Sequence, residues 1–176
     1  MTDLRWLRWP SLRLLWCAFG IGVGLGLALY VVLPPQAQFF FAPLGASSMF
    51  LFGLTRAPPA QPRALLGGHL GCAAIGIACF QLLGDALWVY ALAQGLALLY
   101  MLGCRTMHPP AGANPALMIH NHASLSALWD PVLLGLLCLM GVAVVWSRLY
   151  PGLVSWPCRW WTPVPEGRLS GGGWED

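Results

Sequence analysis

Six apolar stretches of about 20 residues each follow one another along the chain, separated by short polar or proline-rich turns. They cover residues 14–33, 39–55, 64–83, 86–103, 109–129 and 131–149. About 20 consecutive apolar residues are enough for a helix to cross the ~30 Å hydrocarbon layer of a bilayer. The pattern therefore predicts an all-α, polytopic bundle of transmembrane helices, with residues 14–149 as its membrane domain.

The composition excludes a soluble globule. The chain of 176 residues is 58% hydrophobic and only 9% charged, whereas soluble domains carry about 25% charged residues. The net charge of +3 comes from arginines scattered at the ends of the segments, which does not indicate a nucleic-acid partner. The bilayer is the expected partner.

The arginines predict the topology, because positive residues are enriched in cytoplasmic loops. If all six segments cross and the N-terminus is cytoplasmic, every arginine lies on the cytoplasmic side, and Asp85 and Asp130 lie outside. Residues 1–13 and the tail 150–176 are then cytoplasmic, and the tail lies at the interface or is disordered. We expect a multi-pass protein of a bacterial inner membrane. Whether 39–55 and 109–129 span fully or are re-entrant stays open.

Two segments carry a similar motif, which predicts an inverted repeat with halves 14–83 and 86–149. Pro43-Leu-Gly-Ala-Ser47 in the second segment matches Pro110-Ala-Gly-Ala-Asn114 in the fifth. Proline and glycine interrupt a helix, and freed backbone groups in a membrane must face protein or a watery cavity. The alternative is a pair of helix kinks that pack against neighbouring helices.

Broken helices predict a binding site, because the N-terminus of a half-helix presents unpaired N–H groups and the positive end of its dipole. Two such ends that approach each other would bind a small anion. The expected substrate-binding residues come from both motifs and from two histidines: Gly45, Ala46, Ser47, Ser48, His69, His108, Pro109, Pro110, Gly112, Ala113 and Asn114.

The histidines leave several roles open. His108 could gate the entrance, accept a proton that accompanies the anion, or only hold a loop. His69 stands inside an apolar segment, where an ionisable group is functional by default. His120 and His122 are two residues apart and so point to different faces of a helix, which argues against a metal site. We expect neither a metal nor a cofactor.

The string Thr106-Met-His-Pro-Pro-Ala-Gly-Ala113 resembles the signature of the HPP family of membrane proteins, together with Pro43-Leu-Gly-Ala-Ser47 and Gln61-Pro-Arg63 followed by Gly67-Gly-His69. The resemblance covers residues 14–150. It implies a membrane protein usually described with four transmembrane helices. Plastid and cyanobacterial relatives are linked with nitrite transport, so the resemblance adds nitrite as a candidate substrate.

The function expected is a transporter or channel for a small anion. A small scaffold or accessory subunit is the first alternative, and it would tolerate bulky residues in the two motifs. A membrane-embedded enzyme is the second. The apolar segments hold no acidic residue, which argues against it, although a pair of Ser47 or Ser48 with His108 is conceivable. Abundant small residues favour a homo-oligomer.

Overall fold

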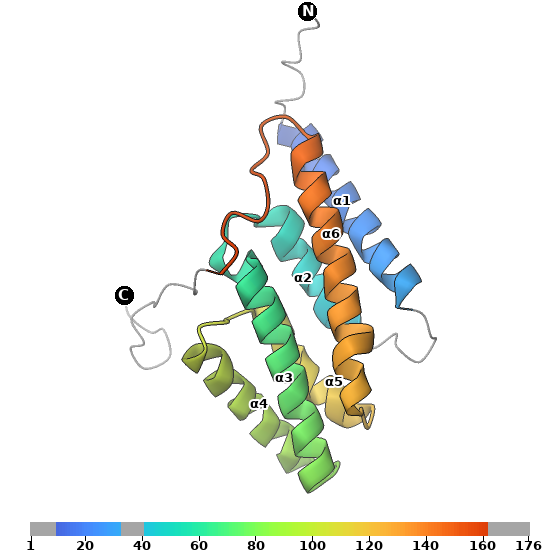
Figure 1. Cartoon of the computed structure of the whole chain (residues 1–176), viewed down its shortest axis with the longest axis vertical. Coiled ribbons are helices and arrows are strands. Elements are labelled where there is room, and N and C mark those ends of the chain that lie inside the picture. The colour runs from blue at the N-terminus through green and yellow to red at the C-terminus, as the bar shows by residue number, and fades with distance from the viewer. Residues whose placement is uncertain (1–9, 33–40, 162–176) are drawn as a thin grey trace, which may run out of the picture.

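The computed structural model describes residues 10–32 and 41–161, and these residues are helical apart from turns and loops (Figure 1). The α-helices are α1 (Pro10–Val31), α2 (Phe41–Gly53), α3 (Pro62–Leu83), α4 (Leu87–Gly103), α5 (Asn114–His120) and α6 (Leu134–Leu149). Shorter helical turns are η3 (Pro58–Ala60), η4 (Pro109–Ala113), η5 (Leu125–Leu128) and η6 (Trp129–Leu133). The all-α prediction is confirmed.

Three stretches are long and apolar enough to cross a bilayer: Ser11–Val31, Pro62–Leu83 and Leu125–Leu149, with hydropathies of 2.1, 1.6 and 2.2. Large apolar side chains also cover the outer faces of the bundle; Leu82, Leu87 and Tyr30 are 81%, 90% and 75% exposed. Exposed apolar surface on this scale is stable in lipid, not in water. The membrane assignment is confirmed.

The helices pack in two similar groups. Helix α1 lies beside α6 and also packs against α2, whereas α4 lies beside α3 and packs against α5 (Figure 1). Helices α2 and α3 meet the η4 turn between the groups. If α1, α2 and α3 correspond to α4, α5 and α6, the α1–α6 contact corresponds to the α4–α3 contact, and α1–α2 corresponds to α4–α5. A repeat requires such a correspondence. The inverted repeat itself stays a prediction.

The two motif-bearing segments differ from the prediction. Helix α2 begins at Phe41 and runs through Pro43 and Gly45 without a break, because a proline in the first turn lacks an N–H that would be unpaired anyway. The 13 described residues of α2 span about 20 Å, and residues 33–40, which precede them, lie outside the described part of the chain.

The second of these segments, 109–129, is not one helix. It consists of η4, the short helix α5, a turn and η5, and within η6 the backbone of Asp130 is not helical (φ −133°, ψ 108°), so the chain bends there before it continues into α6. The predicted break at Pro109–Gly112 is present, and the bend at Asp130 falls where the segment was predicted to end.

Close packing around α3 depends on glycines. A Cβ at Gly76 would lie 2.6 Å from Pro115 Cα, and one at Gly68 would lie 3.0 Å from the Thr106 carbonyl oxygen. These positions let η4 and α5 approach the backbone of α3. In α1, a Cβ at Gly20 or Gly24 would meet Phe52 of α2 and a side chain of α6, whereas Gly22 and Gly26 face open space.

The described part of the tail, residues 150–161, packs against the bundle, which corrects the disordered alternative for these residues. Trp156 is fully buried, and its Nε1–H donates to the Ala60 carbonyl at 2.8 Å. The Cys158 and Arg159 amides donate to Gln61 Oε1 at 3.0 and 3.1 Å. Residues 162–176 of the predicted tail lie outside the described residues.

The arginines gather at one end of the bundle. Arg13 donates to the Gly152 carbonyl, Arg63 to the Cys104 carbonyl and Arg148 to the Trp156 carbonyl, which links the ends of α1, α3, α4 and α6. Asp85 lies between α3 and α4 at the opposite end (Figure 1).

Candidate functional site

Four polar side chains meet in the interior of the bundle: Ser47 of α2, His69 of α3, His108 before η4, and Asn114 at the start of α5. Their exposed fractions are 0%, 1%, 0% and 2%. We call these four residues the polar cluster. Ser47 and Asn114 are the last residues of the two similar motifs, and His69 contacts both.

Hydrogen bonds join the polar cluster into one chain. Ser47 Oγ lies 2.8 Å from His69 Nε2 and 2.7 Å from His108 Nε2. Asn114 Nδ2 lies 3.0 Å from His69 Nδ1 and donates to the His69 carbonyl at 3.0 Å. The two imidazole centroids are 5.1 Å apart. Each of the four side chains thereby has a hydrogen-bond partner, as a low-dielectric interior requires.

The His-Pro-Pro sequence explains how His108 enters this interior. Prolines 109 and 110 occupy the first positions of η4, where no N–H donor is needed, and His108 precedes them in an extended conformation. Its Nδ1 donates to the Pro59 carbonyl at 2.7 Å, and Phe50 packs edge-on against its ring. The imidazole is therefore held at both nitrogens.

Comparisons with known proteins find a family and two transmembrane relatives. The family model of the HPP transmembrane region matches residues 8–154. The chain belongs to the HPP transmembrane family. It is also 28% identical over 137 residues to a transmembrane protein of Dictyostelium discoideum (73% of this chain, 48% of that protein).

A second Dictyostelium transmembrane protein is 27% identical over 171 residues, which are 91% of this chain and 53% of that protein. The chain thus spans about half the length of these curated relatives. No solved structure matches the chain.

The remaining predicted site residues of this HPP protein differ in burial and in their hydrogen bonds. Ser48 donates to the carbonyl of Gly45 in its own helix, at 2.6 Å. Pro110 is buried and Ala46 half-buried, whereas Pro109 and Ala113 are exposed. The roles of these residues stay predictions.

The two motif glycines face other helices and not the polar cluster. A Cβ at Gly45 would have Leu25 Cδ2 as its nearest neighbour, at 3.9 Å, and a Cβ at Gly112 would meet Gln94 Nε2 at 3.4 Å. Gly45 and Gly112 each stand two residues before a member of the polar cluster, and this spacing turns them to a different face of the helical segment.

His120 and His122 lie away from the polar cluster. His122 Nε2 and Tyr90 Oη donate to the two carboxylate oxygens of Asp85, at 2.9 and 2.8 Å, at the end opposite the arginines. These hydrogen bonds, that from His122 first, hold the pKa of Asp85 below its usual value. Within the part of the chain that the structure describes, no three His, Cys, Asp or Glu residues form a group that could hold a metal.

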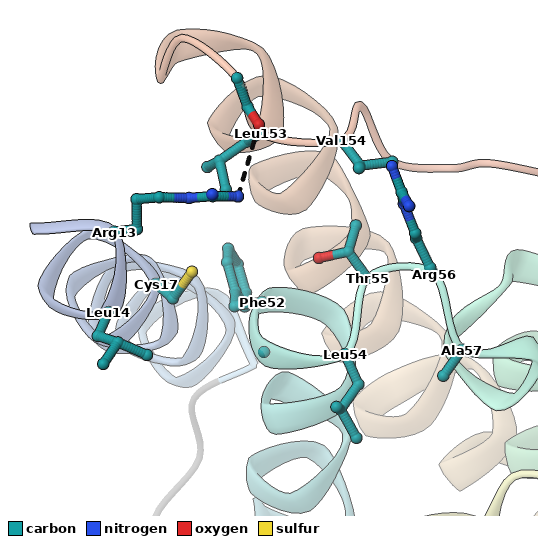
Figure 2. A pocket seen from close by; sticks show the side chains of 12 residues that line it. Arg13, Leu14, Cys17, Phe52, Leu54, Thr55, Arg56, Ala57, Leu153 and Val154 are labelled. Atoms are coloured by element: carbon teal, nitrogen blue, oxygen red, sulfur yellow. Dashed lines mark hydrogen bonds between the residues drawn. The ribbon is translucent and has the colours of Figure 1, made fainter. Parts of the chain in front are cut away.

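A second polar region is an open hollow of ≈ 840 Å³ at the arginine end (Figure 2). Arg13 of α1 and Arg56 after α2 flank it, and Phe52 and Thr55 lie between them. Arg13 Nη2 reaches the Gly152 carbonyl at 3.5 Å, which is a long hydrogen bond that a ligand could displace. Neither arginine was predicted to share a site.

Sequence analysis missed one group that contacts the polar cluster, the Pro59 carbonyl. The Pro59 carbonyl orients His108, yet a backbone acceptor 49 positions away leaves no sequence signal. Gly68, by contrast, stands beside His69 in the quoted motif, and its contact with His108 Cβ shows why a side chain is excluded there.

Proposed function

We propose that this HPP-family protein carries a small anion across the membrane and that the anion binds beside the polar cluster. The supporting observation is that four fully buried polar side chains, from four separate elements, form one hydrogen-bonded chain in the interior of a membrane protein. Buried polar and ionisable groups in membrane helices mark ion and substrate pathways.

The anion is preferred over a cation because of the charges that the protein offers. The described carboxylates, Asp85 and Asp130, are exposed and stand at helix ends. The polar cluster contains no acidic side chain, and Arg13 and Arg56 flank a hollow where anions would be attracted. Nitrite is the first candidate to test because of the family resemblance.

The experiment is anion uptake by purified protein in liposomes, with nitrite, nitrate, formate and chloride compared against protein-free liposomes. We expect Gly112→Leu to abolish uptake, because its side chain would press against Gln94 and displace the η4 turn that precedes Asn114. Gly26→Leu is the matched control, since Gly26 faces open space on α1. Uptake equal to that of protein-free liposomes for all four anions would overturn the proposal, as would full activity of Gly112→Leu.

An enzyme is the second candidate, and one distance favours it. Ser47 Oγ lies 2.7 Å from His108 Nε2, and His108 is oriented through its other nitrogen, which resembles a nucleophile and base pair. A fluorophosphonate probe tests this directly. Labelling that disappears in Ser47→Ala would favour the enzyme; no labelling of the folded protein leaves transport as the better account.

We also propose a homo-oligomer in a cell membrane with the arginine end in the cytoplasm. Gln94 is exposed near the middle of α4, and its amide nitrogen lies close to Gly112 of the η4 turn. Glutamine amides hydrogen-bond across helices in membranes. Gln94→Leu should therefore reduce the amount of cross-linked oligomer. An unchanged cross-linking pattern would show that the surface of α4 around Gln94 is not the oligomer interface.

A further inference from the structure

The hydrogen bonds of Asn114 determine the proton positions on His69. Asn114 Nδ2 donates to the His69 backbone carbonyl, which only accepts, so the amide orientation is determined. The same amide nitrogen faces His69 Nδ1, which must therefore accept. The ring proton of His69 then lies on Nε2 and is donated to Ser47 Oγ.

In His108 the ring proton lies on the other nitrogen, Nδ1. Its Nδ1 faces the Pro59 carbonyl and must carry a proton. Its Nε2 faces Ser47 Oγ, which also lies 2.7 Å from the Pro43 carbonyl of its own helix. The single hydroxyl proton of Ser47 thus has two acceptors at the same distance.

Two complete hydrogen-bond patterns follow, and they differ by one proton. In the neutral pattern Ser47 donates to His108 Nε2. In the protonated pattern His108 Nε2–H donates to Ser47 Oγ, and the Ser47 hydroxyl turns to the Pro43 carbonyl. Ser47 Oγ then accepts from both histidines, which its two lone pairs allow. The polar cluster keeps every described donor paired in both patterns.

His69 cannot take the proton in this way. A second proton on His69 would stand on Nδ1 and point at the amide donor of Asn114, which would lose a hydrogen bond in the interior. The proton therefore belongs to His108.

The groups around His108 supply no negative charge. Ser47 and Phe50 face it from α2, His69 from α3 and the Pro59 carbonyl from η3; His69 is the titratable side chain among these contacts. An unpaired cation in such an interior is costly, and so is an unpaired anion. When a protonated histidine and an anion are buried side by side, their attraction offsets part of the cost of burying each charge.

We infer that His108 Nε2 is a proton-binding site and that one proton moves through the protein with each anion. The inference rests on the proposed function and adds a co-substrate to it. The proton comes from water on the side of entry, binds Nε2 while the anion occupies the space beside the polar cluster, and leaves with the anion on the other side. The transported pair carries no net charge.

The test is uptake into liposomes that contain a pH-sensitive dye, with nitrate or nitrite added outside at a lower pH. Wild-type protein should acidify the lumen as the anion enters, and the anion should accumulate about tenfold per unit of pH difference. Because nitrous acid crosses lipid unaided, rates in protein-free liposomes are subtracted. In His108→Asn, coupled acidification should be lost, whereas His120→Asn, an exposed histidine, should behave as wild type.

The outcomes separate the two proposals. Anion uptake without acidification, or acidification that persists in His108→Asn, overturns the inference and leaves anion transport standing. No uptake of any anion removes the proposed function. In that case, ¹⁵N-imidazole spectra of the folded protein decide the inference separately: His108 should gain a proton when nitrite or nitrate is added, and an unchanged signal would overturn it.

Discussion

At the scale of single residues, the molecule separates its polar groups into three places with different surroundings. The polar cluster is buried and internally paired, the arginines stand at one end, and Asp85 with His122 stands at the other. Buried groups need partners because no water reaches them, whereas the exposed groups can use water and lipid headgroups.

The Asp85 pair gives a prediction about pH. Because hydrogen bonds lower the pKa of Asp85 in the folded state, its stabilising contribution is present above the ordinary value of 3.8 and is lost as the pH falls through the lowered value. Asp85→Asn should therefore melt at a slightly lower temperature than wild type at pH 7, and the gap should close only below pH 3.8.

Asp130→Asn provides the comparison, since Asp130 is an exposed carboxylate at the start of the last transmembrane stretch. Thermal unfolding in detergent at several pH values measures both variants. A gap between wild type and Asp85→Asn that grows as the solution is acidified would contradict the sign of this argument.

At the scale of elements, the tail is part of the fold. Trp156 is buried against the loop that joins α2 to α3, and Gln61 of that loop accepts hydrogen bonds from the tail backbone. The segment thus holds the η3 turn, whose Pro59 carbonyl orients His108. Damage to the tail should reach the polar cluster through this contact.

Trp156→Ala should cost about 3–5 kcal/mol of unfolding free energy, because it empties a fully buried site and removes the hydrogen bond to Ala60. Trp160→Ala is the matched control: its side chain is 56% exposed, so the expected change is within about 0.5 kcal/mol. Equal effects of the two substitutions on thermal stability would show that the tail does not anchor the fold.

The elements also show what could be predicted from the sequence. Apolar length predicted α1, α3 and α4 within a few residues, and the two motifs pointed to Ser47 and Asn114 as site residues. The start of α2 before Pro43 was missed, because a proline at a helix start and one that breaks a helix have the same local pattern. The burial of Trp156 was missed because the tail has no periodicity.

At the scale of the whole molecule, the arginine end determines the orientation that we propose. Cys104 and Cys158 are exposed at this end, whereas Cys72 and Cys79 are buried in α3. A membrane-impermeant maleimide should therefore label inside-out vesicles and leave intact cells unlabelled. The double variant Cys104→Ser/Cys158→Ser is the control. Labelling of both residues from outside intact cells would reverse the orientation.

The packing of short helices between long ones also explains how a small chain could form a pathway. The described part of α2 and the η4–α5 segment are each shorter than a membrane-spanning helix, and each brings one member of the polar cluster into the interior. Irregular backbone at membrane depth is stable only within protein or beside a polar cavity. The interior position of these segments is therefore the physical basis of the proposed anion site.

The most direct measurement of the central claim is the initial rate of anion uptake by Ser47→Ala in liposomes. Ser47 joins both histidines, so its removal leaves both Nε2 atoms without their partner, and the loss of such a buried hydrogen bond is worth about tenfold or more in rate. We predict a decrease of this size in Ser47→Ala, with Ser124→Ala, in an exposed turn, unchanged. A folded Ser47→Ala protein that transports anions at the wild-type rate would contradict passage beside the polar cluster.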